Sequence, residues 1–195
     1  GMMVYMARNK FSGKSGSELM GKKLGLHAYG NVSRNVARIA KGFGMEVYAF
    51  ARSVYADKIE AEGVKAVKSV EELYSTCHYV SLHIPANDQT KKSINFDLLN
   101  RMPKGAVLVN TARKEVVCEE SLKKLFAARK DFRYVADVAP DCLAELEKDF
   151  AERIYCTPKK LGAQTEEANV NAGVAAVKQI VAFFEKGDVS FQVNK

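Results

Sequence analysis

The sequence predicts an α/β fold in which a doubly wound parallel sheet lies between two layers of helices, a three-layer αβα arrangement. Two observations predict it. Short runs rich in β-branched and aromatic residues alternate along the chain with longer stretches whose apolar residues recur at helical spacing. The short runs are also apolar throughout, which is typical of strands covered on both faces. Strands joined through helices are expected to be parallel, with right-handed crossovers.

The pattern predicts six strands and six helices. The strands are LGLHA (24–28), EVYAF (46–50), YVSLHI (79–84), AVLVN (106–110), YVADV (134–138) and RIYCT (153–157). The helices are expected at 30–44, 56–62, 70–75, 95–100, 119–129 and 164–185. The first helix is indicated by Val32, Val36, Ile39, Ala40 and Phe43, which share one helical face. The last helix should stop at Gly187, because glycine is the common residue just past a helix end.

Length and charge limit the class of protein. The 195 residues, 47% of them apolar, suffice for one large domain with a full core. Lysine and arginine total 30 against 23 acidic residues, a net charge of +7. The basic residues form scattered pairs without interleaved aromatics, so we interpret them as a solvated surface suited to an anionic small molecule rather than to nucleic acid. No apolar run approaches the roughly 20 residues of a membrane span, and no secretory leader is evident, so a cytoplasmic protein is expected.

The four cysteines are Cys77, Cys118, Cys142 and Cys156. None belongs to a C-x-x-C pair, and no histidine lies at a zinc-type spacing from any of them. We therefore expect free thiols in a reducing compartment and no metal site.

A turn between the first strand and the first helix is a candidate phosphate-binding element. Backbone N–H groups and the positive dipole end of a helix bind phosphates at this place in Rossmann-like dinucleotide-binding folds. Their fingerprint is G-x-G-x-x-G, and its three positions read Ala28, Gly30 and Ser33 here, with Tyr29 inside the turn. Because one glycine remains, an ordinary strand–helix turn explains this motif about equally well.

The end of the second strand bears on the choice of cofactor. An acid roughly 20 residues after the glycine motif normally binds the adenosine ribose. The strand ends here in Phe50-Ala51-Arg52, without an acid. Arg52 can pair with the 2′-phosphate of NADP, which would favour NADP as the cofactor. If Arg52 is only an exposed surface residue, NAD remains the cofactor. NAD is the expectation and NADP the alternative.

Longer segments resemble a known family. The stretch GKKLGLHAYGNVSRNVARIAKGFGMEVYAF is similar to the cofactor-binding strand and helix of D-isomer-specific 2-hydroxyacid dehydrogenases. VSLHIPANDQTKKSINFDLLNRMPKGAVLVNTARKEVVCEESL resembles the next part of that family's pattern, and TPKKLGAQTEEAN resembles its T-P-H-x-G-A-S-T-x-E-A segment. The resemblance extends from about Gly21 to the C-terminus. Within the family, the lysine-bearing last segment looks closest to a branch of phosphoglycerate dehydrogenases.

The resemblance implies a domain organisation. Family members insert the cofactor domain into a substrate-binding domain, with the substrate in the cleft between them. Residues 1–20 are then the end of a truncated interdomain helix and its linker, 21–187 the dinucleotide-binding domain, and 188–195 a C-terminal tail. The N-terminal substrate-binding domain is expected to be absent from this sequence. Whether Gly1 is native stays open.

The resemblance also implies catalytic residues. Arg113 in NTAR matches the arginine that binds the substrate carboxylate, for which a planar guanidinium is suited. The family's general base is a histidine after T-P, where this chain has Lys159 and Lys160. If L-G-A is kept in register with the family's segment, Lys160 stands at the histidine position. If residues are counted from the proline, Lys159 stands there. A lysine acts as a base only where its surroundings favour the neutral amine, so solvated lysines in a protein without activity are the alternative.

The glutamate that partners the family's histidine is replaced as well. Its position falls on Cys142, with Asp141 beside it, and Asp141 or Glu145 is a candidate partner for Lys160. We do not expect Cys142 to be a nucleophile, because no histidine lies nearby in the sequence. His27 and His78 match no functional position and are interpreted as packing or surface residues.

The remaining matches are to cofactor-binding positions. These are Asn31, Val32, His83, Ile84, Pro85, Thr111 and Asp137, the last near the nicotinamide end, in addition to Tyr29, Gly30, Arg52 and Arg113. The implied activity is NAD(P)-dependent oxidation of a D-2-hydroxyacid, foremost 3-phosphoglycerate in serine biosynthesis, by a homodimer formed through the cofactor domain. Glyoxylate or hydroxypyruvate reduction, and a non-catalytic module in which dinucleotide binding controls assembly, are the alternatives.

Overall fold

The computed structural model describes residues 16–51, 55–162 and 164–194. Its strands are β1 (Lys23–His27), β2 (Glu46–Phe50), β3 (Lys65–Ala66), β4 (Tyr79–Leu82), β5 (Val107–Asn110), β6 (Arg133–Ala136) and β7 (Ile154–Cys156). Its α-helices are α2 (Asn31–Gly42), α3 (Ala56–Ala61), α4 (Val70–Thr76), α5 (Phe96–Asn100), α6 (Glu119–Ala128), α7 (Leu143–Phe150) and α8 (Glu166–Lys186). Two 3₁₀ helices, η2 (Lys114–Val116) and η3 (Ala151–Arg153), precede α6 and β7.

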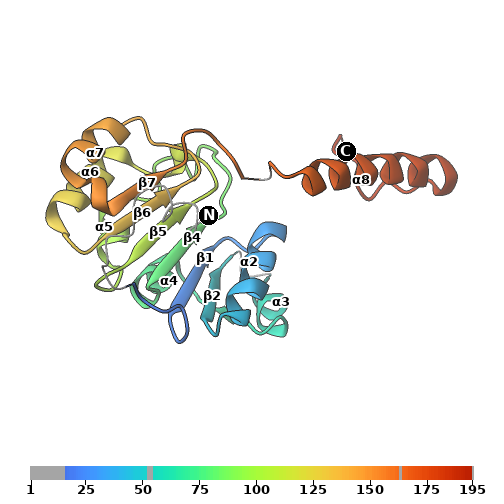
Figure 1. The fold of residues 1–195 in the computed structure, drawn as a ribbon. Coiled ribbons are helices and arrows are strands. Elements are labelled where there is room, and N and C mark those ends of the chain that lie inside the picture. Colours follow the sequence, from blue (N-terminus) through green and yellow to red (C-terminus); the bar gives the residue numbers. More distant parts are fainter. Residues whose placement is uncertain (1–15, 52–54, 163, 195) are drawn as a thin grey trace.

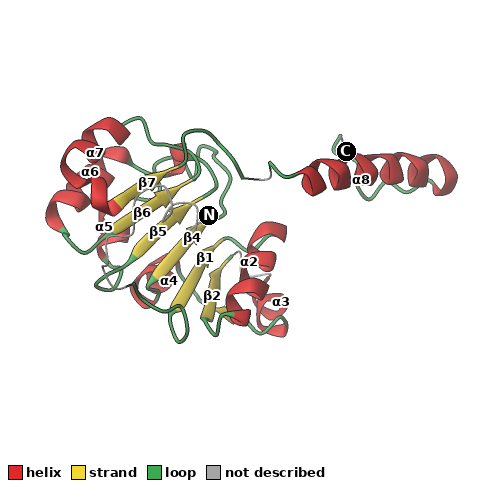
Figure 2. Ribbon diagram, viewed as in Figure 1, coloured by secondary structure: helices red, strands yellow, loops and turns green. Residues whose placement is uncertain are grey.

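The strands form one seven-stranded sheet in the order β3-β2-β1-β4-β5-β6-β7, and every pairing is parallel (Figure 2). The chain runs outward from β1 to β3, returns to the centre, and continues from β4 to β7 in the opposite direction. The order therefore reverses between β1 and β4, where Leu24 pairs with Tyr79 and His27 with Leu82. Open α/β sheets bind their ligands at the carboxyl ends of strands beside such a reversal.

Two apolar clusters pack on the two faces of the sheet. The smaller one joins β1 and β2 to α2 and α3, and includes Leu26 and Ile59. The larger one joins the sheet to α4, α5, α6 and α7. Gly25 allows the close packing of α4, because a Cβ at Gly25 would lie 3.0 Å from both the Cys77 Sγ and the Leu73 Cγ. The predicted three-layer fold is confirmed.

The predicted elements are found with shifted ends, and one strand and one α-helix were missed, as were both 3₁₀ helices. The strand predicted at 79–84 ends at Leu82, and the last helix begins at Glu166 rather than at 164. That helix ends as expected, with Gly187 in the left-handed conformation (φ 65°). The missed strand is the two-residue β3, and the missed α-helix is α7.

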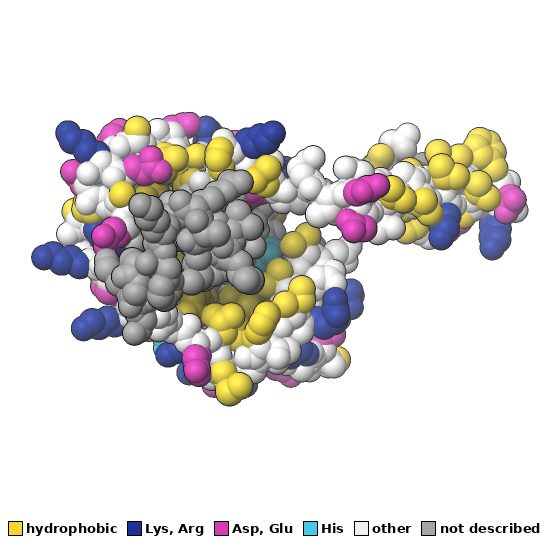
Figure 3. Space-filling model, viewed as in Figure 1, with side chains coloured by type: hydrophobic (Ala, Val, Ile, Leu, Met, Phe, Trp, Pro, Cys, Tyr) yellow, Lys and Arg dark blue, Asp and Glu magenta, His cyan; other side chains and the backbone are white. Residues whose placement is uncertain are grey.

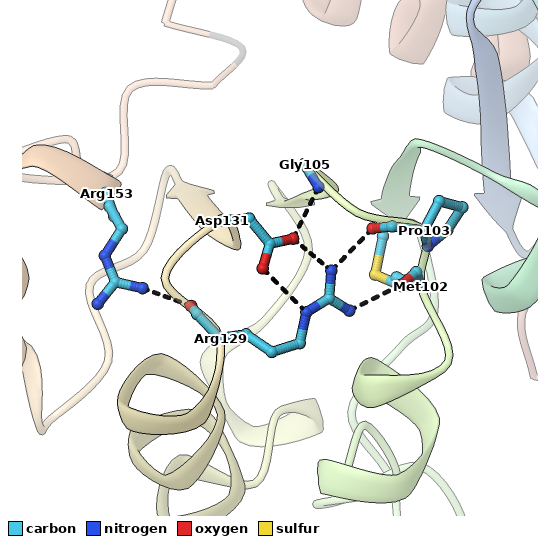
Figure 4. Close-up of polar contacts among 6 residues, drawn as sticks. All are labelled: Met102, Pro103, Gly105, Arg129, Asp131 and Arg153. Atoms are coloured by element: carbon cyan, nitrogen blue, oxygen red, sulfur yellow. Dashed lines mark hydrogen bonds and ion pairs between the residues drawn. The ribbon is translucent and has the colours of Figure 1, made fainter.

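A network of charged side chains ties the loops at the amino edge of the sheet (Figure 4). Arg129 donates to the carbonyls of Met102 (2.7 Å) and Pro103 (2.8 Å), which follow α5. It also pairs with Asp131 (2.5 Å), and the same carboxylate accepts from the Gly105 amide at 2.7 Å. The bonds from Arg129 and this amide hold the pKa of Asp131 far below its usual range.

Helix α8 extends away from the sheet (Figure 1), and none of its described residues is buried. Apolar side chains lie along it in the space-filling view (Figure 3). The exposed ones are Val170, Val174, Val177, Ile180, Val181, Phe183 and Phe184. No helix among the described residues is long and apolar enough to cross a membrane.

Candidate functional site

A cavity of about 500 Å³ opens at the carboxyl ends of β1, β4 and β5, where the strand order reverses. Three loops line it, one after each of these strands. Its lining is Gly30, Asn31, Val32, Ser33, Leu82, His83, Ile84, Pro85, Ala86, Thr111, Ala112 and Arg113. The structure thus brings together residues that are up to 83 positions apart (30 to 113), and eight of them were predicted from the sequence as site residues.

The first wall of the cavity is the N-terminus of α2. Gly30 is the N-cap, and its amide donates to the Ser33 Oγ at 2.8 Å. The first turn of α2 contains no acidic residue, so no carboxylate there repels a bound anion. A Cβ built on Gly30 would meet no atom within 4 Å, so the fold itself does not require glycine there. Because glycine has no side chain, a ligand can approach the backbone of the turn closely.

Ala28 adopts the left-handed conformation (φ 83°), which alanine rarely takes. The position matches the first glycine of the dinucleotide fingerprint, where a tight turn is needed. Ser33, at the third glycine position, is completely buried. The local backbone therefore has the shape of the fingerprint, although two of its glycines are replaced.

Tyr29 lies outside this cavity. Its hydroxyl donates to the Glu62 Oε2 at 2.9 Å, and Arg34 pairs with the same carboxylate at 2.5 Å. Burial and the bond to Glu62 raise the pKa of Tyr29 to about 12. The side chain thus links the turn to the end of α3, beside a separate cavity of about 470 Å³ that Arg38 and Lys41 also line.

A further cavity, of about 490 Å³, lies at the ends of β2 and β3 against α3. Sequence reasoning did not find it, because its lining residues are mostly apolar and belong to no motif. The lining is Phe50, Ala51, Ala56, Ile59, Glu60, Ala66, Val67 and Lys68. Arg52, predicted to bear on the cofactor choice, lies outside the described residues.

The loop that carries Arg113 is fixed by Asn110, which is completely buried at the end of β5. Its amide nitrogen donates to the Arg113 carbonyl (3.0 Å) and to the Tyr134 hydroxyl (3.1 Å). Its oxygen accepts from the Ala112 amide at 3.0 Å. Sequence reasoning placed Asn110 only as a strand residue, although a polar residue at the end of a buried strand was a usable signal.

Asp137, at the end of β6, is 8% exposed and faces the segment that carries the two lysines. Its Oδ1 accepts from the Thr157 hydroxyl and the Leu161 amide, both at 2.9 Å, and its Oδ2 accepts from the Gly162 amide at 2.7 Å. Burial opposes ionisation, but these bonds and the Lys160 charge together hold the pKa of Asp137 below its usual value.

Lys159 and Lys160 lie on this turn with exposed side chains. Neither belongs to the lining of the Gly30–Arg113 cavity. The suggested carboxylate partners of Lys160 are engaged elsewhere, since Asp141 pairs with Lys114 and Glu145 with Lys123.

The cysteine and histidines near the site have perturbed protonation. Burial and Glu119 raise the pKa of Cys142 to about 12, so its thiol is protonated at neutral pH. Burial lowers the pKa of His83 to about 4, and burial with the neighbouring His83 lowers that of His27 to about 4. His27 contacts the Tyr74 hydroxyl (3.2 Å), whereas the buried Nε2 of His83 has no hydrogen-bond partner.

Over the ranges that the structure describes, no three histidine, cysteine or acidic residues come together as metal ligands. All four cysteines are free thiols. The donors that line the Gly30–Arg113 cavity include backbone amides, a neutral imidazole and a guanidinium. This donor set suits a phosphorylated or carboxylated organic ligand such as a dinucleotide.

The chain is similar to known proteins in sequence and in fold. The family model of the D-isomer specific 2-hydroxyacid dehydrogenase NAD binding domain matches residues 3–158. D-3-phosphoglycerate dehydrogenase of Haemophilus influenzae is 32% identical over 183 residues, which cover 91% of this chain and 44% of that protein. Hydroxypyruvate reductase of Thermotoga maritima is 31% identical over 185 residues, which cover 91% of this chain and 58% of that protein.

The crystal structure of NAD⁺-bound 3-phosphoglycerate dehydrogenase of Entamoeba histolytica superimposes with a TM-score of 0.84 at 40% identity, covering 100% of this chain and 62% of that one. The chain spans less than two thirds of the length of each of these three proteins. Because the family model matches well over half of the sequence, the chain belongs to the NAD-binding domain family of the D-isomer-specific 2-hydroxyacid dehydrogenases.

Proposed function

We propose that this chain binds NAD along the carboxyl edge of its sheet. The amides at the N-terminus of α2 hold the pyrophosphate, with Gly30 leaving room for its approach. The cavity at the ends of β2 and β3 receives the adenosine, and the loops of His83 and Thr111 line the nicotinamide side. The proposal rests on the single cavity whose lining includes eight residues that were assigned to cofactor binding from the sequence alone.

NAD is the proposed cofactor. The relative from Entamoeba histolytica, at 40% identity, is a protein with bound NAD⁺. NADP is the second candidate, because β2 ends at Phe50 without an acid in the next two residues and Lys68 lines the adjoining cavity. Titrating the chain with both dinucleotides decides between them.

The proposed reaction is the oxidation of a D-2-hydroxyacid to the 2-oxoacid. NAD⁺ supplies the acceptor for the hydride that leaves the substrate's C2. Arg113 binds the substrate carboxylate, and Lys160, or its neighbour Lys159, takes the proton of the hydroxyl as the carbonyl forms. The guanidinium of Arg113 also suits the negative charge of the substrate.

The proposed substrate is 3-phosphoglycerate, oxidised to 3-phosphohydroxypyruvate in serine biosynthesis. The names of relatives from Haemophilus influenzae and Entamoeba histolytica support it, and so does the net charge of +7. Reduction of hydroxypyruvate or glyoxylate is the second candidate, supported by the Thermotoga maritima relative. A dinucleotide-binding module without catalysis is the third, supported by the lysines and the buried Cys142 that stand at the family's histidine and glutamate positions.

We propose that this activity belongs to a longer protein that adds a substrate-binding domain, and that the protein is a homodimer. The apolar side chains exposed on α8 support burial of this helix against a further polypeptide surface. Light scattering of the chain tests the dimer, which a monomeric mass would contradict.

The experiment that tests the function is NADH formation by the longer protein with 3-phosphoglycerate, D-glycerate and D-lactate in parallel. We expect the highest kcat/KM with 3-phosphoglycerate. The variants Lys160→Met and Lys159→Met separate the two candidate bases, and Lys160→Met should lose at least about 100-fold in kcat, the contribution of a general base. Wild-type turnover in both variants would refute a lysine base. Tight NAD binding without turnover of any substrate would favour the non-catalytic module.

A further inference from the structure

The segment from Thr157 to Gly162 is fastened at both ends to one carboxylate. At its start, the Thr157 hydroxyl donates to the Asp137 Oδ1 and to the Asp137 carbonyl, both at 2.9 Å. At its end, the amides of Leu161 and Gly162 donate to the two carboxylate oxygens at 2.9 and 2.7 Å. Lys159 and Lys160 lie between these two attachments, and their side chains are exposed.

We propose that Asp137 is a positioning residue that holds the lysine-bearing turn Thr157–Gly162 in place at the carboxyl edge of the sheet. The inference rests on the proposed function in one respect, namely that a lysine of this turn acts on the substrate. It goes beyond that function because it gives the acid a role toward the protein's own base.

Gly162 shows that the contact is built for close approach. A Cβ at this position would lie 2.7 Å from the Asp137 Oδ2, nearer than side-chain atoms tolerate. Only glycine therefore lets the Gly162 amide reach the carboxylate at 2.7 Å without displacing it. The carboxylate is also kept ionised, since three donors and the Lys160 charge hold the pKa of Asp137 below its usual value.

The same residue connects the two cationic loops. The Asp137 amide donates to the Asn110 carbonyl at 3.0 Å, which continues the ladder between β5 and β6. Asn110 in turn holds the Arg113 carbonyl through its side chain at 3.0 Å. A continuous series of hydrogen bonds therefore runs from the Arg113 loop through Asn110 and Asp137 to Gly162. This series sets the position of the lysine turn relative to the proposed carboxylate-binding arginine.

Long side chains on an untethered turn would sample many orientations, and a base must lie within hydrogen-bond reach of the proton that it removes. Tethering both ends of the turn reduces the number of backbone conformations from which Lys160 can extend. The expected consequence of losing the tether is a lower kcat, with little change in the KM for NAD.

Amide hydrogen exchange of the chain, followed by NMR, tests the tether without cofactor or substrate. In Asp137→Asn the exchange of Leu161 and Gly162 should accelerate about tenfold or more, since each amide loses a bond to a charged acceptor. The strand residue Val135 serves as the internal reference for global opening. The matched control is Asp131→Asn, which removes a carboxylate bound to an amide at the opposite edge of the sheet and should leave Leu161 unchanged.

The pair Thr157→Val and Thr157→Ser keeps the test decisive if Asp137→Asn does not fold. Valine removes the hydroxyl that reaches the Asp137 carboxylate, and serine retains it. In the longer protein, Thr157→Val should lower kcat at least about fivefold with an unchanged KM for NAD, and Thr157→Ser should restore it, as expected when a hydrogen bond worth about 1 kcal/mol orders a catalytic group.

Unchanged exchange of Leu161 and Gly162 in Asp137→Asn would overturn the tether. Accelerated exchange with an unchanged kcat in Thr157→Val would overturn the positioning role. A weaker NAD affinity with unaltered exchange would assign Asp137 to the cofactor instead. Because the exchange readout needs no turnover, it decides on the tether even where the longer protein oxidises none of the substrates.

Discussion

Replacing Asn110 by alanine tests whether the Arg113 loop is held as the structure indicates. The side chain of Asn110 is completely buried and makes three hydrogen bonds, to the Arg113 carbonyl, the Ala112 amide and the Tyr134 hydroxyl. Each such bond contributes about 1 kcal/mol net, and a buried hydroxyl left without a partner costs a further 1 kcal/mol or more. We therefore expect Asn110→Ala to lower the free energy of unfolding by about 3–4 kcal/mol.

Urea unfolding of the chain measures this loss, and a double-mutant cycle separates its parts. Tyr134→Phe alone removes the partner hydroxyl and should cost about 1 kcal/mol, because Asn110 keeps its two other bonds. The double variant should then be about 2 kcal/mol more stable than the sum of the single losses, since the bond between the two side chains is counted in both single losses and no hydroxyl remains unsatisfied.

The same variant should act on function through Arg113. In the longer protein, Asn110→Ala is expected to raise the KM for the acid substrate by about tenfold, the effect of weakening one carboxylate contact by about 1.4 kcal/mol. The KM for NAD should change less. A loss of stability below about 1 kcal/mol, or strictly additive losses in the cycle, would refute the reasoning, because buried hydrogen bonds in contact must couple.

Three other changes have expected outcomes. Gly30→Ala should unfold at the same urea concentration as the wild type, since its Cβ meets open space. Its NAD affinity, measured by calorimetry, should be at least about tenfold lower, because the methyl group obstructs the phosphate turn; equal affinity would remove Gly30 from the site. Asp131→Asn should destabilise the chain by about 2–3 kcal/mol in urea, because Arg129 loses its charged partner; the wild-type carboxylate has a lowered pKa, so its contribution is present above the unfolded pKa of 3.8 and is lost as the pH falls below it. His27 and His83 have a pKa of about 4 in the folded state against 6.5 in the unfolded state, so the unfolded state binds protons first as the pH is lowered. Between pH 6.5 and 4, each histidine should therefore lower the free energy of unfolding by about 1.4 kcal/mol for every pH unit of acidification. A free energy of unfolding that stays constant over this range in urea titrations would contradict their burial as neutral rings.

The order of strands and helices was predictable because alternation of short apolar runs and helical spacing leaves few topologies. β3 was missed because a two-residue strand has no periodicity to detect. α7 was missed although Leu143, Leu146 and Phe150 share a helical face, because the segment was interpreted only for a family glutamate. Element ends shifted because they depend on capping contacts and not on the apolar pattern.

The site was predictable where a motif follows a strand, as at Gly30, His83 and Thr111, since parallel strands end at one edge of the sheet. Contacts between loops were not predictable in the same way. That Asp137 binds the lysine turn, and that Tyr29 points toward Glu62, follow from three-dimensional packing between segments separated by more than 20 residues. A sequence pattern predicts the element on which such a residue lies, but not the residue that it contacts.

The most direct test of the central claim is an NMR titration of the isotopically labelled chain with NAD. We expect amide shift changes at the turn of Gly30–Ser33, at His83 and Ile84, at Thr111–Arg113 and around the cavity between Phe50 and Lys68. The largest changes at Arg38 and Lys41, which line the separate cavity on α2, or no changes at the end of β1, would contradict that claim.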